Sequence, residues 1–297
     1  MKKTMKAIAA IMLMTVVMIA TGCTPEDDPN NGGGNSNVPE GALNGVFTVN
    51  NEGGQIYFSK GNLWYYNAEE EPYWKFADHQ WDCNTNDAIC YFCWGTSGYN
   101  HGANLYMPES FSQTSDDFFA YGDPKANLGD NTGKADWGYN AIVNGGNQEG
   151  LWRTPHALEF SYIMYQRKTD SNVKFVKAKV NDLDGCVFFP DDWDASKYTI
   201  NNPNVAETYT VDNNISATDW TDILEPAGCV FFPAAGHLSS SSGTDVIVQE
   251  GLEGSYWCSN IASNGDPCCL HILYHDLYLG TQVRYVPYCV RLVRDVQ

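Results

Sequence analysis

The sequence has few basic residues for its length. Its 297 residues include 17 Lys and Arg against 36 Asp and Glu, which gives a formal net charge of −19. A charge of this sign and size repels phosphate backbones and anionic lipid surfaces, so we expect no nucleic-acid partner. The chain also lacks a Walker loop, a dinucleotide-binding fingerprint and a Gly-x-Ser-x-Gly nucleophile elbow. The sequence therefore gives no support to nucleotide-binding or hydrolase functions.

Familiar metal-binding patterns are missing as well. The ten cysteines lack the two Cys-x-x-Cys pairs of a zinc ribbon, and the acidic stretch 130–136 lacks the alternation of an EF-hand loop. Ligand types of a zinc site do occur close together, at Cys268, Cys269, His271 and His275. Adjacent cysteines are poor partners for one ion, however, and no structural zinc spacing is present. We predict that the protein binds no metal or other cofactor.

The N-terminal segment has the pattern of an export signal. Three lysines among the first six residues precede the uncharged apolar run 7–20, which is short for a permanent membrane span. The run ends in Ala-Thr-Gly-Cys at 20–23, which resembles the lipobox of bacterial lipoproteins. We therefore predict a signal peptide over 1–22 and lipidation of Cys23 as the new N-terminus. The alternative is an ordinary cleaved signal followed by a chance cysteine.

The following segment is rich in Pro, Gly and Asn, so we predict that 23–41 is a flexible, lipidated tether. Glu26, Asp27 and Asp28 resemble the acidic signal that sends Bacteroidetes-type lipoproteins to the outer face of the outer membrane. A merely solvated charge run is the alternative. Removal of the signal peptide leaves 14 Lys and Arg against 36 Asp and Glu, a charge of −22. The protein would then contact the membrane only through its acyl chains.

The rest of the chain, 42–297, contains no linker, long charge run or tandem repeat, so we expect one domain. Short β-branched or aromatic runs at 46–49, 56–58 and 63–66 are separated by Gly and Asn turns. This pattern predicts the strands of a meander.

Two short helices are expected in this domain. Thr154 and Pro155 predict an N-cap followed by a first-turn proline. The apolar stripe of that helix would be Leu158, Tyr162 and Tyr165. Ser216 and Asp219 fit a capping box at the start of a second helix. Its apolar positions would be Trp220, Ile223 and Leu224.

The hexapeptide Gly-Cys-Val-Phe-Phe-Pro occurs twice, at 185–190 and at 228–233. A short apolar run bounded by Gly and Pro predicts a strand that is buried on both faces. Cys186 and Cys229 would then be small buried side chains. A disulfide between them is the alternative, and it depends on a Cα spacing that a sequence does not supply.

A series of motifs in the middle and at the end of the chain resembles one protein family. The motifs lie at 91–100, 136–142, 145–154, 188–193, 231–236, 255–259 and 290–293. In this order they resemble the Fibrobacter succinogenes major paralogous domain family of gut bacterial lipoproteins. That family is similar to the C-type lectin fold and to the formylglycine-generating enzyme superfamily, whose Arg-Leu-Pro-Thr-Glu-Ala-Glu-Trp helix start is similar to 151–160. The resemblance implies a single irregular α+β domain with a few short helices and antiparallel strands.

Sugar binding of the lectin type is not expected. The calcium motifs Glu-Pro-Asn or Gln-Pro-Asp followed by Trp-Asn-Asp are absent from the sequence. The prominent tryptophans are expected to pack in the core rather than to stack on sugars, and they are Trp137, Trp152, Trp193 and Trp257. His156 lies at the expected helix start, so we expect it to bond locally rather than to catalyse.

Residues 255–288 are similar to the variable region of diversity-generating retroelement proteins, which are C-type lectin folds with asparagine codons randomised at adenines. Such codons reach Asn, Asp, His, Tyr, Ser, Cys and Val, but never Lys, Glu, Gln, Met or Trp. The candidate variable region 255–293 contains no Lys, Glu or Met. Trp257 and Gln282 would be fixed scaffold. An ordinary paralogue with a polar, loop-rich end is the alternative, and the codons distinguish the two.

With either history, the C-terminal segment suits a binding face, because Tyr, His, Asn and Asp offer flat area together with donors and acceptors. On a strand, Leu270 and Ile272 would point inward, whereas Cys269, His271 and Leu273 would point outward. The residues predicted to contact the ligand are Ser255, Tyr256, Cys258, Asn260, Cys268, Cys269, His271, Tyr274, His275, Asp276, Val283, Tyr285, Val286 and Tyr288.

These patterns predict a non-enzymatic lipoprotein of the outer membrane, displayed on the cell surface, that binds a macromolecular or cell-surface ligand. One alternative is a formylglycine-generating-type enzyme, which uses a cysteine pair to hold copper or to oxidise a thiol. The pair in those enzymes is separated by a few residues, whereas Cys268 and Cys269 are adjacent. The other alternative is a structural fimbrial or surface component.

Overall fold

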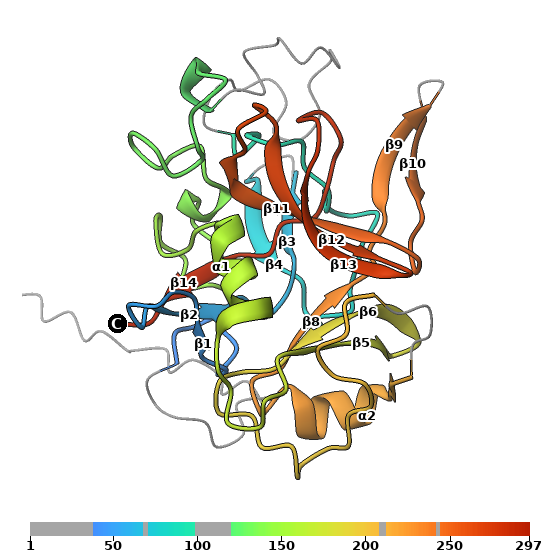
Figure 1. Ribbon diagram of the computed structural model, residues 1–297. Helices are drawn as coiled ribbons and strands as arrows, with labels where there is room; N and C mark the ends of the chain where they lie inside the picture. Colours follow the sequence, from blue (N-terminus) through green and yellow to red (C-terminus); the bar gives the residue numbers. More distant parts are fainter. Residues whose placement is uncertain (1–37, 68–70, 99–119, 208–211, 242–243) are drawn as a thin grey trace, which may run out of the picture. The chain divides into compact units, whose positions relative to one another are not determined.

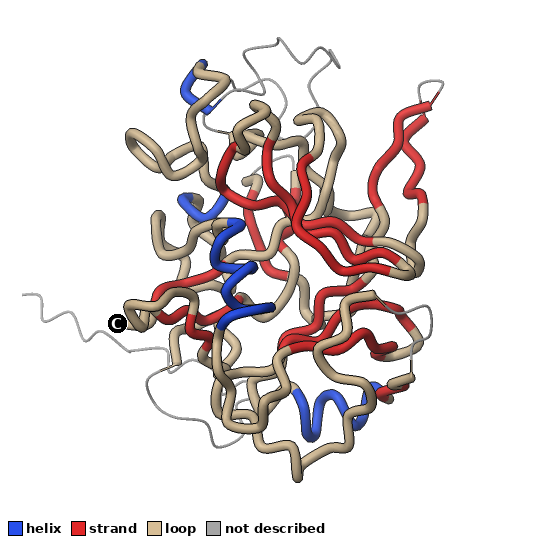
Figure 2. Tube along the Cα trace, in the orientation of Figure 1, coloured by secondary structure: helices blue, strands red, loops and turns tan. Residues whose placement is uncertain are grey.

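The computed structural model describes residues 38–67, 71–98, 120–207, 212–241 and 244–297 (Figure 1). The predicted signal peptide, the lipidation site Cys23 and most of the predicted tether lie outside the described residues. No helix within these described ranges is long and apolar enough to cross a membrane. The described residues belong to one compact unit, an irregular α+β arrangement of mostly antiparallel strands and short helices (Figure 2).

The aromatic and β-branched runs near the N-terminus form strands, as predicted. β1 (Phe47–Thr48) pairs with β2 (Gln55–Phe58), and β3 (Leu63–Tyr66) pairs with β4 (Tyr73–Phe76), both antiparallel. The predicted meander is wrong, because the second neighbour of β2 is β14 (Val293–Asp295) and not β3. A strand from the end of the chain therefore completes the first sheet, a long-range pairing that local patterns do not encode.

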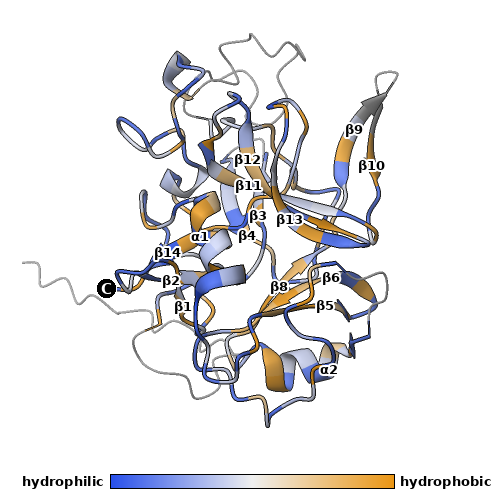
Figure 3. Ribbon diagram, viewed as in Figure 1, coloured by the Kyte–Doolittle hydropathy of each residue, from blue (hydrophilic) through white to orange (hydrophobic). Residues whose placement is uncertain are grey.

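Both copies of the repeated hexapeptide form strands in one four-stranded sheet. Its order is β7 (Asn214–Ile215), β5 (Phe175–Val180), β6 (Leu183–Phe188) and β8 (Val230–Pro233). β6 and β8 are antiparallel neighbours, so the two copies pair with each other, with Cys186 opposite Phe232. Both faces of these strands are buried, which confirms the prediction. The colouring by hydropathy shows β8 as a hydrophobic strand (Figure 3). Cys186 and Cys229 are free thiols in different clusters, so the alternative of a disulfide between them is wrong.

The first predicted helix is present, but it starts later than expected and buries a different stripe. α1 (Ala157–Ser161) continues into a π-helical turn, η4 (Tyr162–Gln166). Its N-cap is His156, whose Nδ1 accepts from the Leu158 amide at 3.0 Å. This local bond was the role expected for His156. The predicted N-cap, Thr154, instead donates to the buried carboxylate of Asp136.

The predicted apolar stripe of this helix is wrong. Leu158 is 71% exposed and Tyr165 is 51% exposed. The buried side chains are Phe160, Ile163 and Met164, which share the opposite face at spacings of three and four. Both stripes have helical spacing in the sequence, so periodicity alone does not decide which one faces the core.

The second helix follows its prediction. Ser216 Oγ accepts from the amide of Asp219 at 3.0 Å and caps α2 (Ala217–Asp219), which continues into η5 (Trp220–Leu224). Trp220 and Leu224 are buried in the cluster that also holds Val187 and Phe231 of the four-stranded sheet. The helix therefore packs on one face of that sheet.

The C-terminal part of the chain forms a three-stranded antiparallel sheet, in the order β11 (Gly254–Ile261), β12 (Pro267–Leu273) and β13 (Asp276–Thr281). Before it, β9 (His237–Ser241) and β10 (Thr244–Val248) form a separate hairpin that projects away from the three-stranded sheet (Figure 1).

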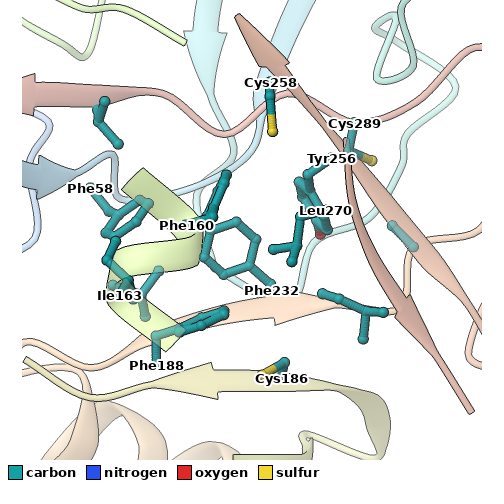
Figure 4. Packing of buried hydrophobic residues seen from close by; sticks show 14 of the residues in the cluster. Phe58, Phe160, Ile163, Cys186, Phe188, Phe232, Tyr256, Cys258, Leu270 and Cys289 are labelled. Atoms are coloured by element: carbon teal, nitrogen blue, oxygen red, sulfur yellow. The ribbon is translucent and has the colours of Figure 1, made fainter. Parts of the chain in front are cut away.

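One hydrophobic cluster joins these parts, and Phe232 of β8 lies at its centre (Figure 4). The Phe232 ring makes edge contacts with Phe160 of α1 at 5.8 Å, Phe188 of β6 at 5.3 Å and Tyr256 of β11 at 4.9 Å between centroids. The four predicted core tryptophans are buried, which confirms their assignment: Trp137, Trp152, Trp193 and Trp257. The C-terminal sheet is thus fixed to the rest of the domain by large buried side chains.

Candidate binding site

The register of the C-terminal sheet brings predicted site residues of different strands together. Ser255 of β11 lies opposite His271 of β12, which lies opposite Tyr278 of β13. These three side chains form a row across one face of the sheet. Tyr256, Leu270 and Ile272 belong to the cluster on the other face. The predicted inward direction of Leu270 and Ile272 is confirmed.

The predicted outward direction of Cys269 and His271 is wrong in one respect, because that face of β12 is covered. Cys269 is fully buried and His271 is 7% exposed. Cys269 belongs to a second hydrophobic cluster with Trp257 and Tyr288. The sheet therefore lies between two packed layers. The alternation of apolar and polar residues predicted that one face of β12 is exposed to solvent. Cys269 and His271 on that face are buried instead.

His271 is the centre of this covered face. Its Nδ1 lies 2.9 Å from Ser255 Oγ, and its Nε2 lies 3.0 Å from Cys269 Sγ. The rings of Tyr278 and Tyr288 pack against the imidazole at centroid distances of 4.9 Å and 6.1 Å. Burial lowers the pKa of His271 to about 4 and raises the pKa of the Cys269 thiol. At neutral pH both groups are uncharged, so the cluster holds the sheet together and has no activated thiolate.

Further predicted contact residues are buried for structural reasons. Tyr256 donates its hydroxyl to the Pro233 carbonyl at 2.8 Å, and Cys258 is buried in the first hydrophobic cluster. Asn260 Oδ1 accepts from the Ala157 amide at 2.9 Å, so it fixes the start of α1 on β11. Tyr288 accepts from Gln282 Nε2 at 2.9 Å. In this conformation these side chains are not available to a macromolecule.

The accessible members of the predicted set lie mainly at the tip of the hairpin between β12 and β13. Tyr274 and His275 form its two-residue loop; Tyr274 is 49% exposed and His275 is exposed. Asp276, which follows, is half-buried. The Lys177 ammonium group of β5 donates to the carbonyls of Leu273, at 2.8 Å, and of Tyr274. A charged donor from another sheet thus holds the tip in place.

The remaining members lie at the other end of β13 or on β12. Val283, Tyr285 and Val286 are half-buried in the segment that follows β13. Cys268 is half-buried and packs against the first cluster, whereas the adjacent Cys269 belongs to the second. Because consecutive strand residues point to opposite faces, the two thiols do not meet at one copper ion or one substrate thiol. No group of three His, Cys, Asp or Glu side chains in the described ranges could hold a metal ion.

Sequence reasoning missed two residues of this region. Tyr278 is 37% exposed and lies between the tip and the end of β13. Its position two residues after Asp276 was a usable signal, since alternate strand residues share a face. Lys177 is separated from Leu273 by 96 residues, and no local pattern indicates their contact. The β13 surface is our name for the polar and aromatic residues of the loop and of β13 that are exposed or half-buried: Tyr274, His275, Asp276, Tyr278 and Thr281.

Comparisons of the chain with models of protein families, with curated proteins and with solved structures returned no match. The family resemblance of the sequence motifs, the outer-membrane location and the binding of a ligand therefore stay predictions.

Proposed function

We propose that this protein is a surface-displayed lipoprotein of the C-type lectin-like fold that binds a macromolecular ligand through the β13 surface. The observation that carries the proposal is the combination of exposure and rigidity at this surface. Tyr274 and Tyr278 expose large aromatic area, while Lys177 fixes the tip and His271 packs against the Tyr278 ring from the neighbouring strand. Rigid aromatic side chains with nearby polar groups are typical of protein-binding surfaces.

The positions of the sequence motifs support the proposed fold family, since separate motifs lie in contact with one another. Asp136 accepts hydrogen bonds from the Gly138 and Thr154 amides at 2.8 Å and 2.9 Å, which joins the motifs 136–142 and 145–154. Arg153 and Val293 exchange backbone hydrogen bonds at 2.9 Å and 2.8 Å, which joins the latter motif to 290–293. Shared packing of this kind is a reason for such motifs to occur together.

The proposed anchor is tested by metabolic labelling with an alkyne-tagged fatty acid. Cys23 should carry the label, and Cys23→Ser should abolish it while Cys83→Ser, at a buried core position, leaves it unchanged. Protease treatment of intact cells should then remove the domain from labelled wild-type cells. Label on the Cys23→Ser variant would contradict the lipoprotein assignment.

The proposed ligand surface is tested with a photoreactive benzoylphenylalanine placed at Tyr274 in the full-length, membrane-anchored protein. Val143 is the matched control, because it is similarly exposed but lies beside β4. Irradiation of the cells in their natural microbial community should give a discrete adduct from position 274 and none from position 143. Equal labelling from both positions, or none from 274, would contradict ligand binding at this surface.

Diversification by a retroelement is part of the proposal, and burial limits the positions at which random replacement is compatible with folding. Random replacement of Tyr256, Cys258 or Cys269 would disrupt packed layers, at a cost of about 2–5 kcal/mol for a large buried side chain. A new side chain at Tyr274, His275 or Asp276 would extend into solvent and would leave the packed layers intact. The codons at these exposed positions should be of the type NNY, and the neighbouring DNA should contain an adenine-rich near-repeat beside a reverse transcriptase gene. Other codons at these positions would remove diversification and leave binding untouched.

A further inference from the structure

β13 has an open edge. The opposite edge of the same sheet, on β11, is covered, because Trp257 donates its amide to the Cys289 carbonyl and Cys289 donates to Ser255, both at 3.1 Å. β13 pairs with β12 alone. On its outer side, no backbone hydrogen bond connects β13 with any other described part of the chain.

The hairpin geometry shows which backbone groups face outward. The two-residue loop makes Leu273 and Asp276 the closing pair, so the bonded pairs alternate along the strands from there. Leu277 and Leu279 therefore direct their N–H and C=O groups away from β12. The Leu277 amide donates to the carboxylate of the preceding Asp276 at 2.8 Å. The Leu279 backbone groups have no hydrogen-bond partner among the described residues.

This edge lacks the proline, the lysine and the β-bulge with which proteins often block edge-to-edge pairing. β13 contains no proline and no lysine, and its register with β12 is regular over all six pairs. Leu277 is buried and Leu279 is half-buried against the first cluster, so the strand is held flat from one side. An unprotected and rigid strand edge is a template for an added strand.

The start of this edge is acidic. Asp276 starts the strand and lies on the same face as Tyr278, two residues further on. Asp276 belongs to no ion pair within the described ranges. The nearby cation, Lys177, is buried and donates to the carbonyl groups of the hairpin tip. A carboxylate beside an exposed tyrosine ring favours a cationic side chain.

We infer that the β13 edge binds an extended, basic segment of a partner protein as an added strand, with Lys or Arg side chains beside Asp276 and the ring of Tyr278. This inference rests on the proposed function, because it names the class of ligand for the same surface. Backbone hydrogen bonds to Leu279 supply affinity, and the Asp276 carboxylate selects positive charge. A chain with a net charge of −19 adds long-range attraction for such a segment.

The inference is tested with synthetic ten-residue peptides and the full-length protein in detergent, with fluorescence anisotropy as the measurement. The peptide of alternating Lys and Thr should bind, with an affinity that falls as salt is added. Its counterpart of alternating Glu and Thr should not bind. A Lys-Thr peptide that is N-methylated at alternate residues should bind at least about tenfold more weakly, because it lacks the amide donors of an added strand.

Two variants connect this binding with β13. Leu279→Pro removes the outward amide, and Asp276→Lys reverses one charge. Each variant should bind the Lys-Thr peptide about tenfold more weakly than the wild type does. Asp222→Lys is the matched control, since it makes the same charge change on the exposed part of η5. Circular dichroism shows whether Leu279→Pro folds, and the N-methylated peptide tests the backbone requirement without any change in the protein.

Equal binding of the Lys-Thr and Glu-Thr peptides, or an unchanged affinity after N-methylation, would overturn the inference. Polymers of the wild-type protein that disappear in Leu279→Pro would assign the edge to a second copy of this chain and also overturn it. If the position-274 adduct forms but no basic peptide binds, the inference fails and the proposed function stands. If neither is observed, both fail.

Discussion

The buried histidine makes a prediction about acid stability. His271 has two neutral neighbours, Ser255 and Cys269, and no carboxylate among its hydrogen-bond partners. Its pKa is about 4 in the folded protein, because burial disfavours the imidazolium, against 6.5 for an unperturbed ring. Between these values the unfolded chain binds more protons than the folded one. Stability is therefore full above pH 6.5 and is lost as the pH falls toward 4.

The size of the effect follows from the two pKa values. Linkage gives a loss from His271 alone of about 2 kcal/mol at pH 5 and about 3 kcal/mol at pH 4, relative to pH 7. A loss of this size is a large share of the stability of an ordinary domain. Protonation of His271 in mild acid should thus weaken its packing against the Tyr278 ring and destabilise the β13 surface.

The assay is urea unfolding of wild type and His271→Asn at pH 7, 6 and 5, both in a Cys23→Ser background that prevents acylation. The asparagine keeps a polar group near Ser255 but does not titrate, so the variant should lose about 2 kcal/mol less between pH 7 and pH 5. His237→Asn is the matched control, because burial also lowers the pKa of this half-buried ring but less completely. Parallel losses in wild type and His271→Asn, or a His271 pKa near 6.5 by NMR titration, would refute the reasoning.

Three further predictions concern other buried polar groups. Asp136→Ala should cost about 3 kcal/mol in urea unfolding, because it leaves three buried donors unpaired, whereas Asp136→Asn should cost less. Arg167→Leu should cost about 3 kcal/mol or more in thermal unfolding, since the guanidinium is fully buried at 2.8 Å from Asp191; a neutral result would contradict a structural role for the pair. Cys186 and Cys229 should be alkylated only after denaturation, and a disulfide between them in the intact mass would contradict the register of β6 and β8.

Local sequence patterns predicted much of the secondary structure. The repeated hexapeptide gave two buried strands, because an apolar run bounded by Gly and Pro has few other uses in a folded domain. Ser216 capped its helix as predicted, since the cap bond forms within four residues. The start of the first helix was predicted less accurately. Both Thr154 and His156 have side chains that can cap a helix, and Asp136 of another segment binds Thr154, so that His156 is the N-cap.

The composition and the order of residues by themselves determined that the chain is acidic, that three lysines precede the apolar run 7–20, and that the segment 255–289 holds four of the ten cysteines and five of the 18 tyrosines. Only the tertiary structure decided which of these side chains reach solvent. Cys269 and His271 alternate with apolar residues as an exposed face would, yet Tyr288 packs against the His271 ring and belongs with Cys269 to the second hydrophobic cluster. Alternation reports two faces of a strand, whereas burial depends on segments that pack there from elsewhere in the chain. The open edge of β13 and its support by Lys177 have the same origin.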